Sequence, residues 1–373
     1  MHVLAMNCGS SSIKFAVVET SEGQRRFEGR LELSDRSYDE ALTDALTLIR
    51  GWSEGQDLIE AVGHRVVHGG ETFRESTLID ERVLTGIEDV SNMAPLHNPP
   101  GLLGIRRLRE TYPDLPQVAV FDTAFHRTLP PRAYLYAVPR SLHREHGVRR
   151  YGFHGTSHRF VAQEAVRRLH LPDAESRVVT AHLGSGCSAC AVLAGESVET
   201  TMGLSPLEGL VMGTRSGDVD PGLHSFLAQR LGMNLESIDD LLNKESGLLG
   251  LSELSADVRE LEAAAHRGHT EAQLALEIFC YRLARQVAGL CVPLGGLDAL
   301  VFTGGIGENS SGVRARVIQL LSHLGLELDP EKNGLHGAKS DGLISRSTDP
   351  RAMVIPTDEE FLIAQDTAER LAK

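Results

Sequence analysis

Residues 3–18 of the chain read VLAMNCGSSSIKFAVV, and residues 178–193 read VVTAHLGSGCSACAVL. Each stretch begins and ends with an apolar run, and glycine and serine residues dominate the segment between the runs. This order predicts a strand, a tight turn and a second strand. The two turns lie roughly 175 residues apart, so they indicate two related domains rather than a solenoid, whose repeats recur every ~20–50 residues.

Apolar residues recur at three-to-four spacing between the predicted strands, which predicts helices. Ser157 is expected to cap one of these helices, and Gly147 and Gly232 are expected at breaks between elements. The mixture of strands and helices predicts two α/β domains, residues 1–126 plus 361–373 and residues 127–360, with the last helix packing back on the first domain. The helices are expected at 38–52, 101–112, 157–171, 223–231, 254–266, 271–290, 311–324 and 359–371.

The bulk composition narrows the class of protein. The chain has 373 residues, 41% of them hydrophobic, which is enough for two cores. Its net charge of −14 argues against nucleic acid or an anionic membrane as a partner. No run of ~18 apolar residues predicts a membrane span, and no charged segment followed by an apolar one predicts a signal peptide. The five cysteines are an odd number and fit reduced thiols, so we expect a cytoplasmic protein.

Three glycine-rich segments are candidate phosphate-binding turns. Residues 7–14 (NCGSSSIK) and 182–186 (HLGSG) allow backbone N–H groups to approach phosphate oxygens. Either turn alone is equally typical of a tight hairpin, but two matching turns favour one nucleotide held between two domains. Residues 300–309 (LVFTGGIGEN) end an apolar run in glycines, which fits a ligand site at a strand end or a tight strand–helix turn. The sequence contains neither a P-loop nor the protein-kinase motifs.

Four charged or titratable residues stand in unusual settings. Arg65 lies in a strand-like run closed by two glycines, and Arg215 lies in a glycine-flanked loop. Asp122 ends an apolar run, where an acid is either a Mg2+ or base candidate or a helix cap. His154 stands between glycines. Two His-x3-His spacings lack the glutamate of a zinc protease and are flanked by glycines, so we expect no zinc hydrolase.

Taken together, these strings resemble the acetate kinase family, within the larger group of actin-, Hsp70- and sugar-kinase-like ATPases. The resemblance runs essentially from end to end. It rests on residues 7–14, 64–70, 94–100, 121–126, 151–158, 203–209, 213–221 and 302–309.

The resemblance implies two duplicated actin-like domains of βββαβα type that flank an active-site cleft. It implies Mg2+-dependent, in-line transfer of the γ-phosphoryl of ATP to acetate, giving acetyl phosphate and ADP, in a homodimer. Mn2+ is an alternative metal, and no nucleic acid or membrane partner is expected.

The resemblance also assigns residues to roles. Arg65, Asp122, His154 and Arg215 match catalytic positions, and Asn7, Asp122 and Glu359 match the metal-associated ones. The substrate pocket corresponds to Arg65, Val67, Leu96, His97, Phe153 and Pro206. The nucleotide-binding positions correspond to Asn7, Ser10, Ser12, Lys14, His182, Gly184, Ser185, Gly186, Asp257, Arg259, Gly304, Gly305, Ile306, Gly307 and Asn309.

The chain departs from the family's usual motifs at three positions. Ser185 stands where asparagine is usual, Asp358 where asparagine is usual, and Gly304 where alanine is common. These departures leave the nucleotide preference open.

Two alternative functions remain at this point. One is the same chemistry on propionate or butyrate, because one methylene gives only about 10–200-fold discrimination. The other is a non-catalytic, actin-like nucleotide switch. A carboxylate nucleophile is already ionised at pH 7 and needs no strong general base, so we interpret Asp122 mainly as an organiser of the metal.

Overall fold

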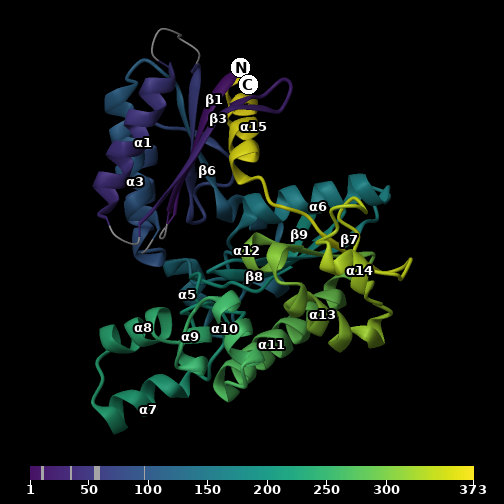
Figure 1. The fold of residues 1–373 in the computed structure, drawn as a ribbon. Coiled ribbons are helices and arrows are strands. Elements are labelled where there is room, and N and C mark those ends of the chain that lie inside the picture. The colour runs from purple at the N-terminus through teal and green to yellow at the C-terminus, as the bar shows by residue number, and fades with distance from the viewer. Residues whose placement is uncertain (10–11, 34–35, 54–58, 96) are drawn as a thin grey trace. The chain divides into compact units, whose positions relative to one another are not determined.

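A computed structural model describes residues 1–9, 12–33, 36–53, 59–95 and 97–373 (Figure 1). The chain forms two compact units, each with its own sheet. Unit 1 contains Met1–Arg127, Phe153–Phe160 and Asp358–Lys373, and unit 2 contains Thr128–Gly152 and Val161–Thr357. The segment Phe153–Phe160 belongs to the first unit, whereas our predicted domain boundary placed it in the second.

Unit 1 is built on a six-stranded sheet in the order β3-β2-β1-β4-β6-β5. β1 pairs antiparallel with β2 and parallel with β4, and β4 pairs parallel with β6. The strands are β1 (His2–Cys8), β2 (Ser12–Glu19), β3 (Gln24–Glu32), β4 (Ala61–Val66), β5 (Thr77–Leu78) and β6 (Gln117–Phe121). The helices are α1 (Tyr38–Ser53), α2 (Glu81–Asp89), η1 (Ser91–Met93), α3 (Asn98–Thr111), η2 (Asp122–Thr128) and α15 (Glu359–Leu371).

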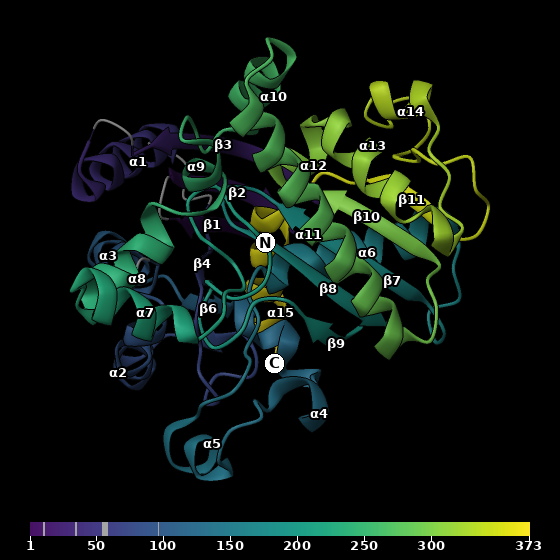
Figure 2. The same cartoon turned by 90° about the horizontal axis from the view of Figure 1, so that it is seen from below.

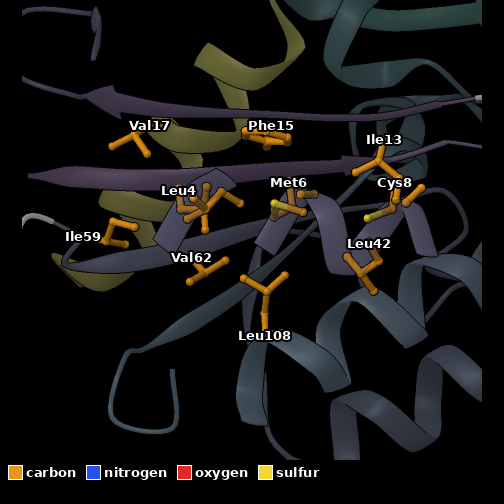
Figure 3. Packing of buried hydrophobic residues seen from close by; sticks show 13 residues of the cluster. Leu4, Met6, Cys8, Ile13, Phe15, Val17, Leu42, Ile59, Val62 and Leu108 are labelled. Carbon is orange, nitrogen blue, oxygen red and sulfur yellow. The ribbon is translucent and has the colours of Figure 1, made fainter. Parts of the chain in front are cut away.

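The strands β1 and β2 are buried on both faces of the sheet, which explains why they read as almost continuous apolar runs. Leu4 and Met6 of β1 point toward α1 and α3, where they meet Leu42 and Leu108 (Figure 3). The alternate residues of the same strands pack against Ile363 and its neighbours in α15, on the other face. The predicted helix 359–371 therefore matches α15, and it packs on the first sheet as expected.

Unit 2 is built on a five-stranded sheet in the order β11-β10-β7-β8-β9. β7 pairs antiparallel with β8 and parallel with β10, and β10 pairs parallel with β11. The strands are β7 (Arg177–Leu183), β8 (Cys187–Leu193), β9 (Glu196–Thr200), β10 (Ala299–Thr303) and β11 (Arg351–Val354). Read from β9 to β11, this sheet has the same strand order and the same strand directions as the first five strands of the unit 1 sheet, read from β3 to β6. The prediction of two related α/β domains is therefore confirmed.

The helices of unit 2 include the long α11, which lies beside β7, β8 and β9 (Figure 2). They are α4 (Pro131–Tyr134), α5 (Arg140–His146), α6 (Gly155–Leu169, whose first turns belong to unit 1), α7 (Gly222–Leu231), α8 (Leu235–Lys244), α9 (Gly247–Ser252), α10 (Val258–His266), α11 (Thr270–Leu294), α12 (Gly304–Asn309), α13 (Ser311–Leu320), η3 (Ser322–Leu324) and α14 (Pro330–Gly334).

Helix ends follow local sequence signals in most places. Gly147 and Gly232, both predicted as breaks, adopt left-handed conformations at the ends of α5 and α7, although α5 itself was not predicted. The predicted cap at Ser157 is wrong, because α6 begins two residues earlier, at Gly155.

All five cysteines are free thiols. Cys187 and Cys190 lie three residues apart on β8, so their side chains point to opposite faces of the sheet. In the part of the chain that the structure describes, no helix combines the length and the apolar character needed to cross a lipid bilayer.

Candidate active site

Three neighbouring parallel strands of unit 1 bring Asn7, Arg65 and Asp122 together. Asn7 and Arg65 lie near the carboxyl ends of β1 and β4, and Asp122 directly follows β6. The carboxyl ends of parallel strands meet at one edge of a sheet, which is the usual ligand-binding edge of α/β folds. Arg65 donates to both oxygens of Asp122, with its Nη2 2.6 Å from Oδ2, and its Nη1 lies 3.0 Å from Asn7 Oδ1. Two of the three predicted catalytic residues in this unit, Arg65 and Asp122, are therefore in contact.

The amino terminus of α15 adds two more carboxylates to this edge. Asn7 Nδ2 lies 2.9 Å from Glu359 Oε2 and 3.1 Å from Glu360 Oε1. Thr156, in the first turn of α6, donates to Asp122 Oδ1 at 3.2 Å and to Glu359 Oε1 at 3.5 Å. Asp122, Glu359 and Glu360 are all buried. The predicted metal-associated residues Asn7, Asp122 and Glu359 thus form one hydrogen-bonded cluster.

This cluster carries more negative than positive charge. Burial raises the pKa of Asp122, the Arg65 guanidinium opposes that rise, and nearby Glu359 adds to it. Burial alone would lower the pKa of Arg65, but Asp122 and Glu359 outweigh burial and raise it. Arg25 reaches Asp358 at 2.5 Å and Glu360 at 3.7 Å, so four carboxylates face two guanidiniums.

That excess of carboxylates fits a divalent cation. Within the described ranges, no group of three or more His, Cys, Asp or Glu side chains is arranged to hold a metal by itself. Mg2+ usually binds one or two carboxylates and completes its octahedron with waters and substrate phosphates, so Asn7, Asp122 and Glu359 are an appropriate protein contribution.

The segment before α6 is packed tightly against Asp122. A Cβ on Gly155 would lie 2.0 Å from the Asp122 carbonyl oxygen, so only glycine fits there. His154 adopts a φ of 54°, and its ring lies 6.4 Å from that of His158. The ring of His126 lies 5.9 Å from His158, and its Nε2 lies 3.0 Å from the Phe153 carbonyl oxygen. The structure therefore places His154 in a histidine-rich segment beside the acidic cluster.

The predicted substrate-pocket residues of unit 1 surround the end of β4. Val67 and Phe153 are buried, and the His68 ring lies 5.4 Å from the Phe153 ring. Asn98 fixes this segment, because its side chain exchanges two 3.0 Å hydrogen bonds with the backbone of His68. His97 precedes α3 directly. Leu96 lies outside the described residues.

The first predicted phosphate-side turn is partly described. Gly9 N–H donates to the Ser12 carbonyl oxygen at 3.0 Å, which closes the turn between β1 and β2. Lys14 lies opposite Asn7 in the antiparallel pair, so the two side chains share a face. Ser10 lies outside the described residues.

Arg215 lies in unit 2 in a buried, mostly neutral environment. Its side chain is 9% exposed, and its Nη1 donates to the Pro206 carbonyl oxygen at 2.8 Å. Burial lowers the pKa of Arg215, and Cys187 opposes that shift. Among the described residues, no carboxylate pairs with Arg215. A buried cation without an anionic partner is costly, so this position suits an anionic ligand.

The predicted nucleotide loops of unit 2 also lie at one edge of their sheet. Gly184 N–H donates to the Gly186 carbonyl oxygen at 3.0 Å, and Ser185 at the tip is exposed. β10 pairs with β7 so that Thr303 lies opposite His182. The cluster Gly304, Gly305, Ile306, Gly307 and Asn309, predicted as a loop, instead forms the short helix α12.

Gly304 has a φ of 77°, and a Cβ there would lie 2.8 Å from the Leu183 carbonyl oxygen, so glycine suits this approach to β7. Asp257 caps α10, and Arg259 hydrogen-bonds to it and lowers its pKa, so these two predicted adenosine residues pair with each other.

Sequence reasoning missed several residues that shape these sites. Glu360 and Thr156 complete the acidic cluster, yet an acid in a first helical turn usually indicates only a favourable helix dipole. Glu308 accepts from Gly304 N–H at 2.9 Å and holds the start of α12. Arg314 is fully buried and donates to the carbonyl oxygens of Gly307 and Glu308, which holds the end of α12. No local pattern marked Arg314, because its partners, backbone carbonyls and the side chains of Asn333 and His336, come together only in the fold.

Comparisons with known proteins agree with these observations. A sequence model described as the acetokinase family matches residues 30–365. The acetate kinase of Shewanella sp. (strain W3-18-1) is 50% identical over 394 residues, covering 100% of this chain and 98% of that protein. A solved propionate kinase from Francisella tularensis is 41% identical with a TM-score of 0.90, and each chain is 99% covered. A solved Porphyromonas gingivalis acetate kinase is 38% identical with a TM-score of 0.87 and the same coverage.

Proposed function

The chain belongs to the acetokinase family, and from this premise we propose that it transfers the γ-phosphoryl group of ATP to acetate, reversibly and in line, giving acetyl phosphate and ADP. The observation that carries the proposal is the contact of Arg65, Asp122, Asn7 and Glu359 at the carboxyl edge of the unit 1 sheet. A guanidinium and an acidic, cation-attracting cluster are the two requirements for bringing a carboxylate to a phosphoryl group.

The charges explain why both are needed. Acetate and the γ-phosphoryl are anions, and two unit charges ~4 Å apart repel by about 4 kcal/mol at an effective dielectric of ~20. Arg65 is fixed by Asp122 and Asn7, so its guanidinium needs little reorganisation when it meets an anion. We assign Arg65 to the acetate carboxylate and the moving phosphoryl.

Five further residues receive roles in the proposal, two toward the phosphoryl group and three toward the metal. Arg215, buried without a carboxylate partner, neutralises charge on the phosphoryl in flight. His154 donates to the same group from its position beside the acidic cluster. Asn7, Asp122 and Glu359 hold Mg2+, which when bound offsets the charge of the phosphates. Because acetate is already ionised, Asp122 organises the metal and removes no proton.

The apolar pocket sets the length of acid that fits. Val67 follows Arg65 by two residues, and Phe153 lies beside His68; both are buried in unit 1, and they would contact the acetate methyl group. Leu96, His97 and Pro206 complete the proposed pocket by resemblance alone. The 41% identity to a propionate kinase makes propionate the second candidate substrate, because one methylene is worth only ~0.8 kcal/mol.

Val67→Ala tests the pocket. Removing two methyl groups should make room for a longer acyl chain, so kcat/KM for propionate relative to acetate should rise several-fold. Val83→Ala, a matched truncation of a buried valine in α2, should leave this ratio unchanged. An unchanged ratio in Val67→Ala would remove Val67 from the pocket.

The activity itself is tested by trapping the acyl phosphate. The purified protein is incubated with Mg-ATP and hydroxylamine, and the acyl hydroxamate is measured with acetate, propionate, butyrate and no acid. The proposal expects acetate-dependent product that falls with chain length. A maximum at propionate would keep the chemistry and change the substrate, whereas no product with any acid would favour a nucleotide switch.

A further inference from the structure

The segment between β9 and α7 is long and irregular, yet it carries Arg215. It runs through residues 201–221 of unit 2 with neither helix nor strand. Irregular segments of this length inside a compact domain are uncommon and are usually functional. Turn-type bonds, such as the 3.1 Å bond from Met212 N–H to the Arg215 carbonyl oxygen, hold the backbone of Arg215, and other contacts direct its guanidinium.

Residues 204–208 form a short arch whose two ends are joined by one hydroxyl group. The Tyr136 oxygen accepts a hydrogen bond from Leu204 N–H at 2.8 Å. The same hydroxyl donates to Glu208 Oε2. One side chain from outside the segment thus connects the first and last residues of the arch.

Arg150 fixes the same arch from a second direction. Its Nη2 donates to Glu208 Oε1 at 2.7 Å, and its Nη1 donates to the carbonyls of Thr200 and Thr201, each at 2.9 Å. Both Glu208 oxygens are therefore engaged, one by Tyr136 and one by Arg150. These contacts are partly buried, and together they hold the Glu208 carboxylate from two sides.

The network packs directly against Gly203, where a side chain would displace it. A Cβ on Gly203 would lie 1.6 Å from Glu208 Oε2 and 2.2 Å from the Tyr136 oxygen. At the top of the arch, the Pro206 carbonyl oxygen accepts the 2.8 Å hydrogen bond from Arg215. The direction of that carbonyl depends on the two ends of the arch, and the Arg215 guanidinium depends on that carbonyl.

We infer that Tyr136 is a positioning residue for phosphoryl transfer, which sets the Arg215 guanidinium through the 204–208 arch. The inference rests on the proposed role of Arg215. Burial, with Glu208 adding to it, raises the pKa of Tyr136, so the hydroxyl keeps its proton and remains a donor at neutral pH. Tyr136 reaches Arg215 only through Leu204, Glu208 and Pro206, so its contribution to turnover should vanish when Arg215 is absent.

A double-mutant cycle tests this dependence. Hydroxamate formation from acetate is measured for the wild type, Tyr136→Phe, Arg215→Ala and the double variant, with kcat and both KM values determined. Phenylalanine keeps the ring and removes only the bridging hydroxyl. We expect Tyr136→Phe to lower kcat about tenfold, the scale of one lost buried hydrogen bond, with little change in KM for ATP. In the Arg215→Ala background, Tyr136→Phe should have no further effect.

Two controls separate positioning from general stability. Tyr281→Phe, at an exposed site on α11, should leave kcat unchanged. Thermal unfolding of each variant shows whether it folds. If Tyr136→Phe does not fold, Glu208→Gln replaces it in the cycle, because glutamine keeps a side-chain oxygen for one of the two partners.

An unchanged kcat in Tyr136→Phe, or an equal loss in both backgrounds, would overturn the inference. If the wild type itself shows no acetate-dependent turnover, the proposed function is overturned instead.

Discussion

At the scale of the residue, Arg215 is a buried guanidinium whose hydrogen-bond partner is a neutral carbonyl. Arg215→Ala should lower kcat by roughly 10³ or more, the effect of removing an arginine that stabilises a phosphoryl-transfer transition state. Steady-state kinetics with acetate and ATP measure this. Arg230→Ala, an exposed arginine on α7, is the matched control and should be near wild type. A loss smaller than tenfold would remove Arg215 from the mechanism.

His64 provides a second residue-scale prediction, for stability rather than activity. Burial lowers the pKa of His64 to about 4, although the hydrogen bond that His64 Nε2–H donates to Gln117 Oε1 opposes the shift. In the unfolded chain its pKa is about 6.5, so the unfolded state binds the proton first as pH falls. The free energy of unfolding should therefore decrease by roughly 1–2 kcal/mol from pH 6.5 to pH 5 on account of His64 alone.

The measurement is urea unfolding at both pH values, with His64→Gln as the comparison. The variant has no imidazole to titrate, so its stability should change less between the two pH values than that of the wild type. An identical pH dependence in the two proteins would show that His64 is not held neutral in the folded state.

Some site residues could be predicted from the sequence because they follow strands or lie in long motifs. Asn7, Arg65 and Asp122 are of this kind, and the structure brings them into contact. Glu360 and Thr156 could not be predicted, because their roles depend on where α15 and α6 begin relative to β1 and β6. Tyr136 lies in no glycine-rich or charged motif, and only the folded arch gives it a role.

At the scale of the element, the start of α6 is the tightest helix position beside the site. Gly155→Ala would place a Cβ 2.0 Å from the Asp122 carbonyl oxygen, so α6 or η2 must move. Overpacking of this kind costs about 1–3 kcal/mol. We expect a lower unfolding midpoint together with reduced activity, because Thr156 and Asp122 separate.

A helical glycine elsewhere gives the opposite expectation and serves as the control. A Cβ on Gly289 in α11 would meet no neighbouring element within 4 Å, and the backbone there is helical. Gly289→Ala should raise stability by about 0.5–1 kcal/mol through helix propensity. Calorimetry on the two variants tests the pair. Equal effects would mean that the contact with Asp122 does not constrain α6.

Some amphipathic helices were predicted well, whereas others that are at least as amphipathic, α2 and α8, were missed. Residues 359–371 match α15, and 38–52 match α1 to within one residue. The predicted helix 254–266 instead begins at Val258, because Asp257 caps it there. α8 (Leu235–Lys244) was missed although Ile238 and Leu242 are buried, because it packs in a small separate cluster with α7.

At the scale of the whole molecule, the similarity between residues 3–18 and 178–193 was the main evidence for the fold. Both segments form antiparallel hairpins, β1–β2 and β7–β8, which are the first two strands of their sheets along the chain. The two sheets then have the same strand order. Strand and turn chemistry is local, so it could be read from one sequence. The division of the chain could not, because Phe153–Phe160 joins unit 1 by contacts between residues far apart in the chain.

The central claim is that Asp122, with Asn7 and Glu359, organises the divalent cation for phosphoryl transfer to acetate. The most direct measurement is the Mg2+ dependence of acetohydroxamate formation in the wild type and in Asp122→Asn, which keeps the shape and removes the charge. We predict that Asp122→Asn needs at least about tenfold more Mg2+ for half-maximal rate, as for the loss of a charged hydrogen-bonding partner. The same Mg2+ dependence in both proteins would contradict the account.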